Sequence, residues 1–396
     1  MNCPAVAIMA LAQRAMTIPG MLTSPAPTIN NNIHTHTSME NTLVAQELRF
    51  PDVDISQRYW QAGFRGCSIA AARSAVQKAI RQNDVEVARY WAGILLASHL
   101  IESAYGRPVV IASEDIGPAD DSCISLAVKA YDLYKGLRNK EYYKVEVWRN
   151  MRDVRDIRLA LDAVIRYLCS AEKSRVCDHA CVGVVCNVYQ AEKQVLVYPD
   201  AATKQSWEDA ITNVTAATLK EAAEAAAKLI AHDGTTPILK IFTRHPRLTD
   251  VRAAMVAMSH KADPPFLHVV HGIYILAGAS ATRPAAAMPD LAHFSAEDEE
   301  RVGALYREIL YGPLSTPPRY ATDDMHVKGM KPGDVAKFVE VQNQALQPKS
   351  ITIVDPFYEL ARTTGAAARE AFHFAEKKRK KEEAEGRPAK KKKKTA

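Results

Sequence analysis

The spacing of apolar residues is the feature that most constrains this fold, because it repeats every three to four positions through much of the chain. One amphipathic segment shows the pattern most clearly, with apolar positions at Ile157, Leu161, Val164, Ile165 and Leu168. The same period runs through 69–80, 87–95 and 124–134. Alternating apolar and polar residues, which are typical of strands, are rare. The sequence therefore predicts an all-α protein.

Caps, breakers and shifts in composition divide the chain into five expected parts. Asp84 can cap one helix, Gly234 can close another, and Ser295 opens a capping box with Asp298. The expected parts are a disordered leader (1–46), a helical domain (47–199), a mostly helical insertion (200–312), a loop-rich segment with a short helix that completes the domain (313–366), and a charged helix with a basic tail (367–396).

Two local features are expected within these parts. The helix that begins after Asp84 is predicted to end near Gly106, because Pro108 follows it. Short strands are predicted at 238–242 and 351–354, where β-branched and aromatic residues gather.

Composition narrows the class of protein. Hydrophobic residues make up 47% of the chain, which supports a core and excludes a wholly disordered protein. No stretch of about 18 uncharged apolar residues occurs, so no membrane association is expected. Seven cysteines at irregular spacing favour a reducing compartment over a disulfide framework. The first 39 residues contain no acid and a single arginine, which favours a disordered leader over a targeting segment.

The net charge of +6 is concentrated at one end of the chain. Residues 377–394 hold eleven Lys/Arg and three Glu, a net +8, so the rest of the chain carries −2. Two basic blocks around a polar spacer are typical of a nuclear import signal or a nucleic-acid tether, with a solvating tail as the alternative. The blocks comprise Lys377, Lys378, Arg379, Lys380, Lys381, Lys390, Lys391, Lys392, Lys393 and Lys394. We expect DNA contacts through these residues and a nuclear location.

Several motifs of nucleotide and hydrolytic chemistry are missing from the sequence. It contains no P-loop, no Gly-x-Gly-x-x-Gly after a strand, no Gly-x-Ser-x-Gly elbow and no His-Glu-x-x-His. Nucleotide hydrolysis by this chain alone is therefore not expected, and we predict neither an enzymatic activity nor a cofactor.

A cysteine- and histidine-containing stretch suggests a zinc site at first sight. The stretch contains Cys177, His179, Cys181 and Cys186, which fall on one predicted helix, and residues of one helix cannot surround a tetrahedral ion. Small buried side chains on a packed helix are therefore the preferred interpretation, and no metal is predicted.

Two polar groups remain as candidates for function. Lys173, Arg175, Asp178 and His179 could hold a phosphate or the acid of a partner, or form an ion-pair network at a helix end, which is the preferred interpretation. Asp324 and His326 lie in a predicted loop and could bind a metal or move protons, although structural capping is preferred there.

The order of these motifs is more specific than any one of them. Residues 110–120 read Val-Ile-Ala-Ser-Glu-Asp-Ile-Gly-Pro-Ala-Asp. This stretch resembles a signature of the replication-associated recombination ATPases, namely the bacterial RarA (MgsA) proteins and the eukaryotic Werner-helicase-interacting protein. Residues 75–91 resemble the preceding helix pair of that family's C-terminal helical domain, and 171–175 resemble its Ala-x-Lys-Ser motif.

The resemblance is closer to standalone phage, bacterial and large-virus proteins that keep the helical domain and lack the ATPase. They share Lys-Ser-Arg-x-x-Asp-His-Ala, found here at 173–180. Residues 321–329 resemble a later motif of theirs, with Val327 in place of a threonine and one residue fewer before the glycine. One candidate functional cluster is drawn from these motifs: Glu114, Asp115, Asp178, His179, Asp324 and His326.

The resemblance implies a helical fold like the collar of clamp-loader-type ATPases over about 55–190. It also implies self-association, commonly as a tetramer, and a link to stalled forks and single-strand/duplex junctions. Because the ATPase is missing, the motor function does not carry over, and a separate replication ATPase is one expected partner.

Three functions are compatible with the sequence. The preferred one is a non-enzymatic, DNA-associated, oligomeric protein of DNA replication or recombination, with Lys173, Arg175 and the basic tail contacting DNA. The first alternative is a structural scaffold or virion-associated DNA-packaging protein that uses the same tail. The second is a metal-dependent enzyme, which requires the two polar groups around His179 and His326 to meet in space.

Overall fold

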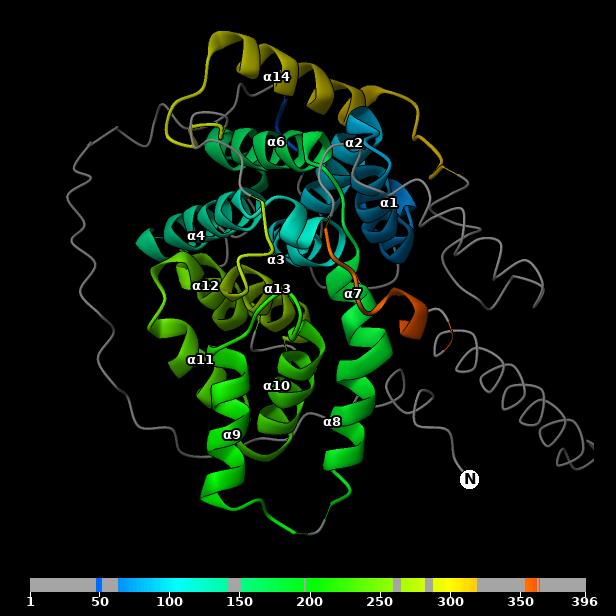
Figure 1. Ribbon diagram of the computed structural model, residues 1–396. Helices are drawn as coiled ribbons and strands as arrows, with labels where there is room; N and C mark the ends of the chain where they lie inside the picture. The colour runs from blue at the N-terminus through cyan, green and yellow to red at the C-terminus, as the bar shows by residue number, and fades with distance from the viewer. Residues whose placement is uncertain are drawn as a thin grey trace, which may run out of the picture.

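The computed structural model describes residues 48–51, 63–141, 151–195, 197–258, 265–281, 288–318, 353–361 and 363. Every regular element within these ranges is helical, and they contain no strand. The predicted all-α class is therefore confirmed. Figure 1 shows an upper layer of helices on a lower helical bundle. None of the described helices is long and apolar enough to cross a bilayer.

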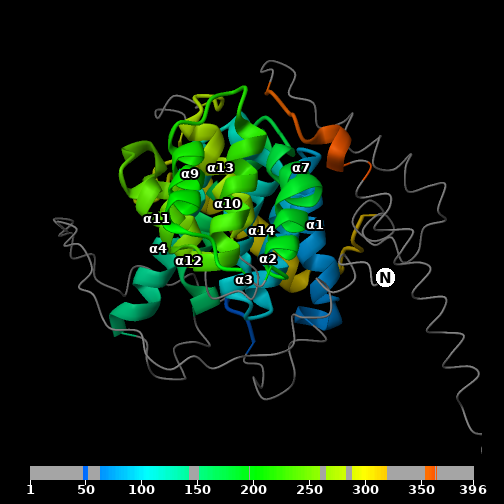
Figure 2. The ribbon, with the colours of Figure 1, turned by 60° about the horizontal axis from the view of Figure 1, so that its bottom comes forward.

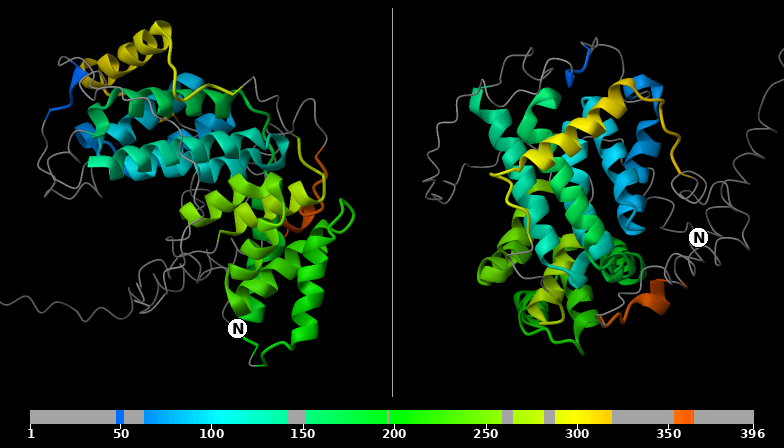
Figure 3. Two further views of the ribbon diagram at one scale, coloured as in Figure 1. Left: turned by 90° about the vertical axis from the view of Figure 1, so that its left-hand side faces the viewer. Right: turned by 90° about the horizontal axis from the view of Figure 1, so that it is seen from above.

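The upper layer is built by helices from both ends of the described chain. It contains α1 (Ile69–Arg81), α2 (Val85–Ala97), α3 (Ile101–Ile111), α4 (Ser122–Glu141), α6 (Arg155–Ser170) and α14 (Ala296–Tyr311). Helix α14 crosses α2 and α6, as the right-hand view of Figure 3 shows. The predicted insertion at 200–312 therefore ends in a helix that belongs to the upper layer.

A nearly continuous helical stretch connects the upper layer to the lower bundle. This stretch comprises α7 (Val176–Ala180), the π-helical turn η9 (Cys181–Val185) and α8 (Cys186–Glu192). The remaining helices are α9 (Ala201–Thr212), α10 (Leu219–Asp233), α11 (Thr236–Thr243), α12 (Thr249–Met258) and α13 (Phe266–Leu276). Figure 2 shows α9 and α10 side by side, and α10 also packs on α8 and η9.

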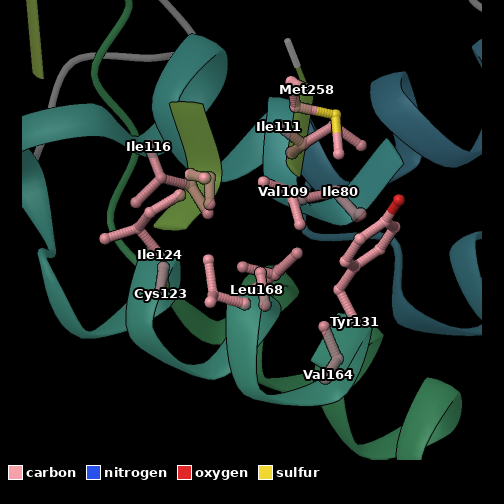
Figure 4. Packing of buried hydrophobic residues seen from close by; sticks show 14 of the residues in the cluster. Ile80, Val109, Ile111, Ile116, Cys123, Ile124, Tyr131, Val164, Leu168 and Met258 are labelled. Carbon is pink, nitrogen blue, oxygen red and sulfur yellow. The ribbon is translucent and has the colours of Figure 1, made fainter. Parts of the chain in front are cut away.

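The two layers share one hydrophobic core, so they form one body. A single cluster of buried apolar side chains runs from α1 to α14. Figure 4 shows Met258 of α12 close to Val109 and Ile111 of α3, at the junction between the layers. Helix α13 adds to the junction, because it packs on α12 of the lower bundle and on the turn at 112–116 that follows α3. The residues expected to form an insertion are thus packed into the core.

Several predicted caps are present in the structure. Asp84 accepts a hydrogen bond from the Val87 N–H at the start of α2. Ser295 and Asp298 form the reciprocal capping box of α14. Gly234 ends α10 with a φ of 69°, in the left-handed region that glycine favours. These features depend on neighbouring residues only, which is why the sequence predicts them well.

Two predicted boundaries are wrong. The helix that begins after Asp84 ends at Ala97, His99 turns the chain with a φ of 58°, and a new helix continues through Pro108 to Ile111. Burial of Pro108, Val109 and Ile111 offsets the hydrogen bond that the proline removes. The strand predicted at 238–242 is helix α11, because Ile238, Ile241 and Phe242 pack on neighbouring helices.

Other predictions lie partly or wholly outside the described residues. Residues 353 and 354 are not helical, while 351 and 352 are outside the described ranges, as are the leader, the loop at 321–329 and the basic tail. The predictions for these segments stay predictions.

Candidate functional site

A buried polar cluster lies where α1, α3 and α7 meet. The stretch that resembles the family signature forms a π-helical turn there, η6 (Ala112–Ile116), directly after α3. Gly117 ends this turn with a φ of 49°. A Cβ at this position would lie only 3.1 Å from the Cys177 Sγ. The turn thereby directs Glu114 and Asp115 toward the polar side chains of α1.

Asp115 is the centre of this cluster. Its carboxylate is fully buried, and its Oδ1 accepts from the Arg81 guanidinium at 2.7 Å from Nε and 2.6 Å from Nη2. Its Oδ2 accepts from Gln77 Nε2 at 2.8 Å, and its backbone carbonyl accepts from the Ser174 N–H at 2.9 Å. The single residue therefore joins α1, η6 and the segment that leads into α7.

Glu114 lies at the outer edge of the cluster, with 19% of its side chain exposed. Its Oε1 accepts from Gln77 Nε2 at 2.7 Å and lies 3.9 Å from Arg81 Nη2. Burial, together with the negative charges of Asp115 and Asp178, raises the pKa of Glu114 to about 7 against the opposing effect of Arg107 and Arg81. This carboxyl group can therefore hold or release a proton near neutral pH.

Arg175 and Asp178 form the ion-pair network that the sequence predicts. Arg175 is the N-cap residue of α7, and its guanidinium contacts the Asp178 carboxylate one turn later. Its Nε also lies 4.0 Å from the Asp115 Oδ1. Burial alone would lower the pKa of Arg175, but Asp178, Asp115 and Glu114 together raise it. Three acids of the predicted functional cluster, Glu114, Asp115 and Asp178, thus meet around one arginine.

Lys173 has a structural role, so it is removed from the candidate DNA contacts. The side chain is only 5% exposed. Its ammonium group donates to Asn83 Oδ1 at 2.7 Å and to the backbone carbonyls of Leu168, Cys169 and Ala171 at the end of α6. The cation therefore satisfies the last carbonyl groups of a helix and faces away from solvent.

His179 faces a different part of the molecule from Asp178. Its Nδ1 lies 2.7 Å from Asp355 Oδ2, and its ring contacts the ring of Tyr358 edge to face at 5.4 Å between centroids. We call residues 353–361 the C-terminal strap, because this segment returns to α7 after a long separation in sequence. Figure 1 shows the strap beside α7.

Two further contacts hold the strap in place. The Tyr274 hydroxyl donates to the Val354 carbonyl at 2.8 Å, which ties the strap to α13. A Cβ on Gly183 would lie 2.9 Å from the Ala361 nitrogen, so a glycine is needed for the strap to approach η9 this closely. His179 is thus a docking residue for the strap.

A second buried network contains serine, histidine and aspartate but is not arranged as a catalytic triad. Ser113 Oγ lies 2.8 Å from His268 Nδ1 and 3.1 Å from His271 Nδ1, and His271 Nε2 lies 3.3 Å from Asp121 Oδ1. Both Ser113 and His271 are completely buried. No substrate can reach the serine in this arrangement, and the network joins η6 to α13 instead.

Hydrogen-bond logic assigns the protons of this network. The Asp121 carboxylate only accepts, so His271 donates from Nε2, and its Nδ1 accepts from the Ser113 hydroxyl. The Ser113 oxygen then accepts from the Nδ1–H of His268. Ser113, His268 and His271 each have a partner in this arrangement, which makes the network a structural link between η6 and α13.

The cysteine interpretation is confirmed for the side chains that the structure describes. Cys177 is fully buried and Cys181 is 9% exposed, both within the packed helix. In the described ranges, no group of three or more His, Cys, Asp or Glu could hold a metal ion. Asp324 and His326 lie outside those ranges, so the enzyme hypothesis, which needs them beside Asp178 and His179, stays untested.

Sequence reasoning missed the cationic side of the cluster. Arg73, Gln77 and Arg81 recur at intervals of four residues on α1, and Arg107 faces them from α3. A row of polar side chains on an otherwise buried helix is a detectable signal, but its partners in η6 are more than thirty residues away.

No family model, curated protein or solved structure matches this chain.

Proposed function

We propose that this chain is a non-enzymatic, DNA-associated helical protein that acts in DNA replication or recombination and assembles with copies of itself. The observation that carries the proposal is the separation of charge along the sequence. Residues 377–394 carry a net +8 while the rest of the chain carries −2. Each phosphate that such a segment neutralises releases counterions, which drives binding to nucleic acid.

The use of arginines inside the folded body supports this assignment. Arg81, Arg89 and Arg158 are buried and paired with Asp115, Asp162 and Asp153. Cations of this kind stabilise the fold and are not free to contact DNA. The basic tail is therefore the main candidate for phosphate contacts.

The C-terminal strap provides an anchor for the tail. Ala361 lies against η9, and Lys377 follows it by sixteen residues. At an upper limit of about 3.5 Å per residue, the first basic block, which ends at Lys381, stays within about 70 Å of η9. DNA held by the tail would thus be kept close to the helical body.

Self-association and the replication context come from the motif resemblance. In the full-length ATPases the corresponding helical domain forms oligomers, commonly tetramers, so we propose a homo-oligomer here, with a separate replication ATPase as a partner. The basic blocks support nuclear import, in a eukaryotic host cell or for a eukaryotic virus. A mass measurement in solution, with and without DNA, tests the oligomer: a monomer under both conditions contradicts it.

Deletion of residues 377–396 tests the DNA proposal. We expect lower DNA affinity and a flatter dependence of affinity on salt, with unchanged helical content by circular dichroism. Deletion of residues 1–46 is the matched control, because it removes more chain but almost no net charge. Unchanged DNA binding after the tail deletion refutes the role of the tail.

The same assay separates the replication role from a packaging role. Affinities for forked, single-stranded and duplex DNA are compared at one salt concentration. A preference for forks supports action at replication junctions. Equal affinity for the three DNAs favours the scaffold or virion-associated packaging protein, which needs no junction.

A further inference from the structure

Two arginines beside the polar cluster form no ion pair with a carboxylate among the described residues, although the charge of Arg107 acts on Glu114. Arg73 Nε donates to Ser103 Oγ at 2.9 Å, and Arg107 Nη2 donates to Gln77 Oε1. The Arg107 Nε is buried and has no hydrogen-bond partner in the described part of the chain. Both side chains are half-buried, and each guanidinium experiences the positive charge of the other. Desolvation and this repulsion make the pair costly without an anion.

The charges of the whole cluster do not balance. Four guanidinium groups gather here, from Arg73, Arg81, Arg107 and Arg175. They face three carboxyl groups, from Glu114, Asp115 and Asp178, so at least one positive charge is left over. When Glu114 is protonated, the excess becomes two.

We propose that Arg73 and Arg107 bind a phosphate group beside Gln77, whose Oε1 holds the Arg107 guanidinium in place. A phosphate dianion would cancel an excess of two charges, whereas a carboxylate supplies only one. Guanidinium groups that converge from two helices also suit the several acceptor oxygens of a phosphate better than a planar carboxylate. The unpartnered Arg107 Nε offers one donor for this ligand.

The half-buried position of the pair favours a terminal phosphate over one within a nucleic-acid backbone. A backbone phosphate is flanked by two nucleotides and is bound at exposed side chains, whereas an end phosphate can enter a recessed site. Two sources share this chemistry: the phosphorylated end of a DNA strand and a free phosphate or nucleotide. The DNA source rests on the proposed function, and the free source does not.

Glu114 makes the binding dependent on pH. It faces polar groups from every element packed around it: Gln77 and Arg81 on α1, Arg107 on α3, Asp115 in η6 and Asp178 on α7. In its protonated form the carboxyl group removes one negative charge and can donate a hydrogen bond to the ligand. Binding of a dianion should therefore strengthen as the pH falls from 8 to 6.

The primary experiment is calorimetric titration of the full chain with inorganic phosphate. We expect saturable binding that weakens roughly tenfold or more in the R73Q/R107Q variant, because two charge-assisted donors are lost. The matched control is R244Q/R247Q, which removes the same charge from two exposed arginines and should bind as the wild type does. Circular dichroism checks that each variant is folded. Absence of saturable binding, or equal loss in both variants, overturns the proposal.

A sulfate titration isolates the effect of Glu114. Sulfate stays a dianion between pH 6 and 8, so a change in its affinity reports on the protein. We expect tighter binding at pH 6 than at pH 8 in the wild type and no such difference in E114Q. A pH dependence of the same size in E114Q contradicts the role of Glu114.

A DNA titration identifies the source of the phosphate. Single strands with a 5′-phosphate, a 3′-phosphate or two hydroxyl ends are compared on the full chain and after deletion of 377–396. A preference for one phosphorylated end that R73Q/R107Q removes assigns the site to DNA ends. Equal affinities with retained phosphate binding assign it to a free ligand. Phosphate binding without any DNA binding supports this site and refutes the proposed function, whereas DNA binding without phosphate binding does the reverse.

Discussion

Replacement of Asp115 by alanine should cause a large loss of stability. Asp115 is fully buried, and its carboxylate accepts one hydrogen bond from Arg81 Nε and one from Gln77, while its Oδ1 also lies 2.6 Å from Arg81 Nη2. The D115A change removes the close ion-pair partner of the Arg81 guanidinium, which is 8% exposed, and leaves only Glu114, 3.9 Å away, as an acidic neighbour. Breaking a buried pair in this way costs about 3–5 kcal/mol. This is a substantial fraction of the roughly 5–15 kcal/mol that stabilises a typical domain.

The measurement is urea unfolding followed by circular dichroism, with the thermal midpoint as a second readout. A loss of about 3–5 kcal/mol corresponds to a drop of roughly 6–20 °C in a body of this size. The exposed acid Glu300 provides the control, because E300Q should change the free energy of unfolding by less than about 0.5 kcal/mol.

A double variant tests the cause. If the loss comes from the unpaired guanidinium, D115A/R81M should be more stable than D115A alone, since no buried charge is left. A loss below about 1 kcal/mol in D115A, or a double variant that is no more stable than the single one, refutes the reasoning.

Three further predictions concern single side chains. The pKa of Glu114 is raised in the folded protein to about 7 from its ordinary 4.5, so its contribution is complete below pH 4.5 and is lost as the pH rises through 7. The fall in unfolding free energy between pH 5 and 8 should therefore be smaller in E114Q, by up to about 3 kcal/mol. K173M should lose about 2 kcal/mol or more in urea unfolding, because three helix-end carbonyls lose their donor, while DNA affinity per folded molecule stays unchanged. H271F should cost about 2 kcal/mol by breaking the link from Ser113 to Asp121, and faster amide exchange in α13 would report it.

Helix existence was largely predictable, because it depends on residues close together in the sequence. The apolar period of 157–168 predicts α6, and the capping residues Asp84 and Ser295 predict the starts of α2 and α14. The contact between Arg175 and Asp178 was predictable for the same reason, since the two residues are one helical turn apart.

The predicted element boundaries were wrong where tertiary packing opposed the secondary-structure preference of the local sequence. Pro108 is expected to stop a helix, yet α3 continues through it because the residues around it are buried against the core. Residues 238–242 have the composition of a strand, but they form part of helix α11, which packs its apolar side chains on neighbouring helices. In both cases the free energy gained by burying apolar side chains outweighs the local secondary-structure propensity. That burial depends on residues far away in the sequence, so the local sequence does not predict it.

By itself, the sequence determined the helical class, most caps, the local ion pair at α7 and the concentration of positive charge at 377–394. Only the tertiary structure decided which charged side chains are left to bind a ligand. It buried Lys173 against helix-end carbonyls, paired Arg81 with Asp115 and left Arg73 and Arg107 without an ion pair in the described part of the chain. The physical reason is that the energy of a charge depends on its solvent exposure and its nearest partners, and both are set by residues far apart in sequence.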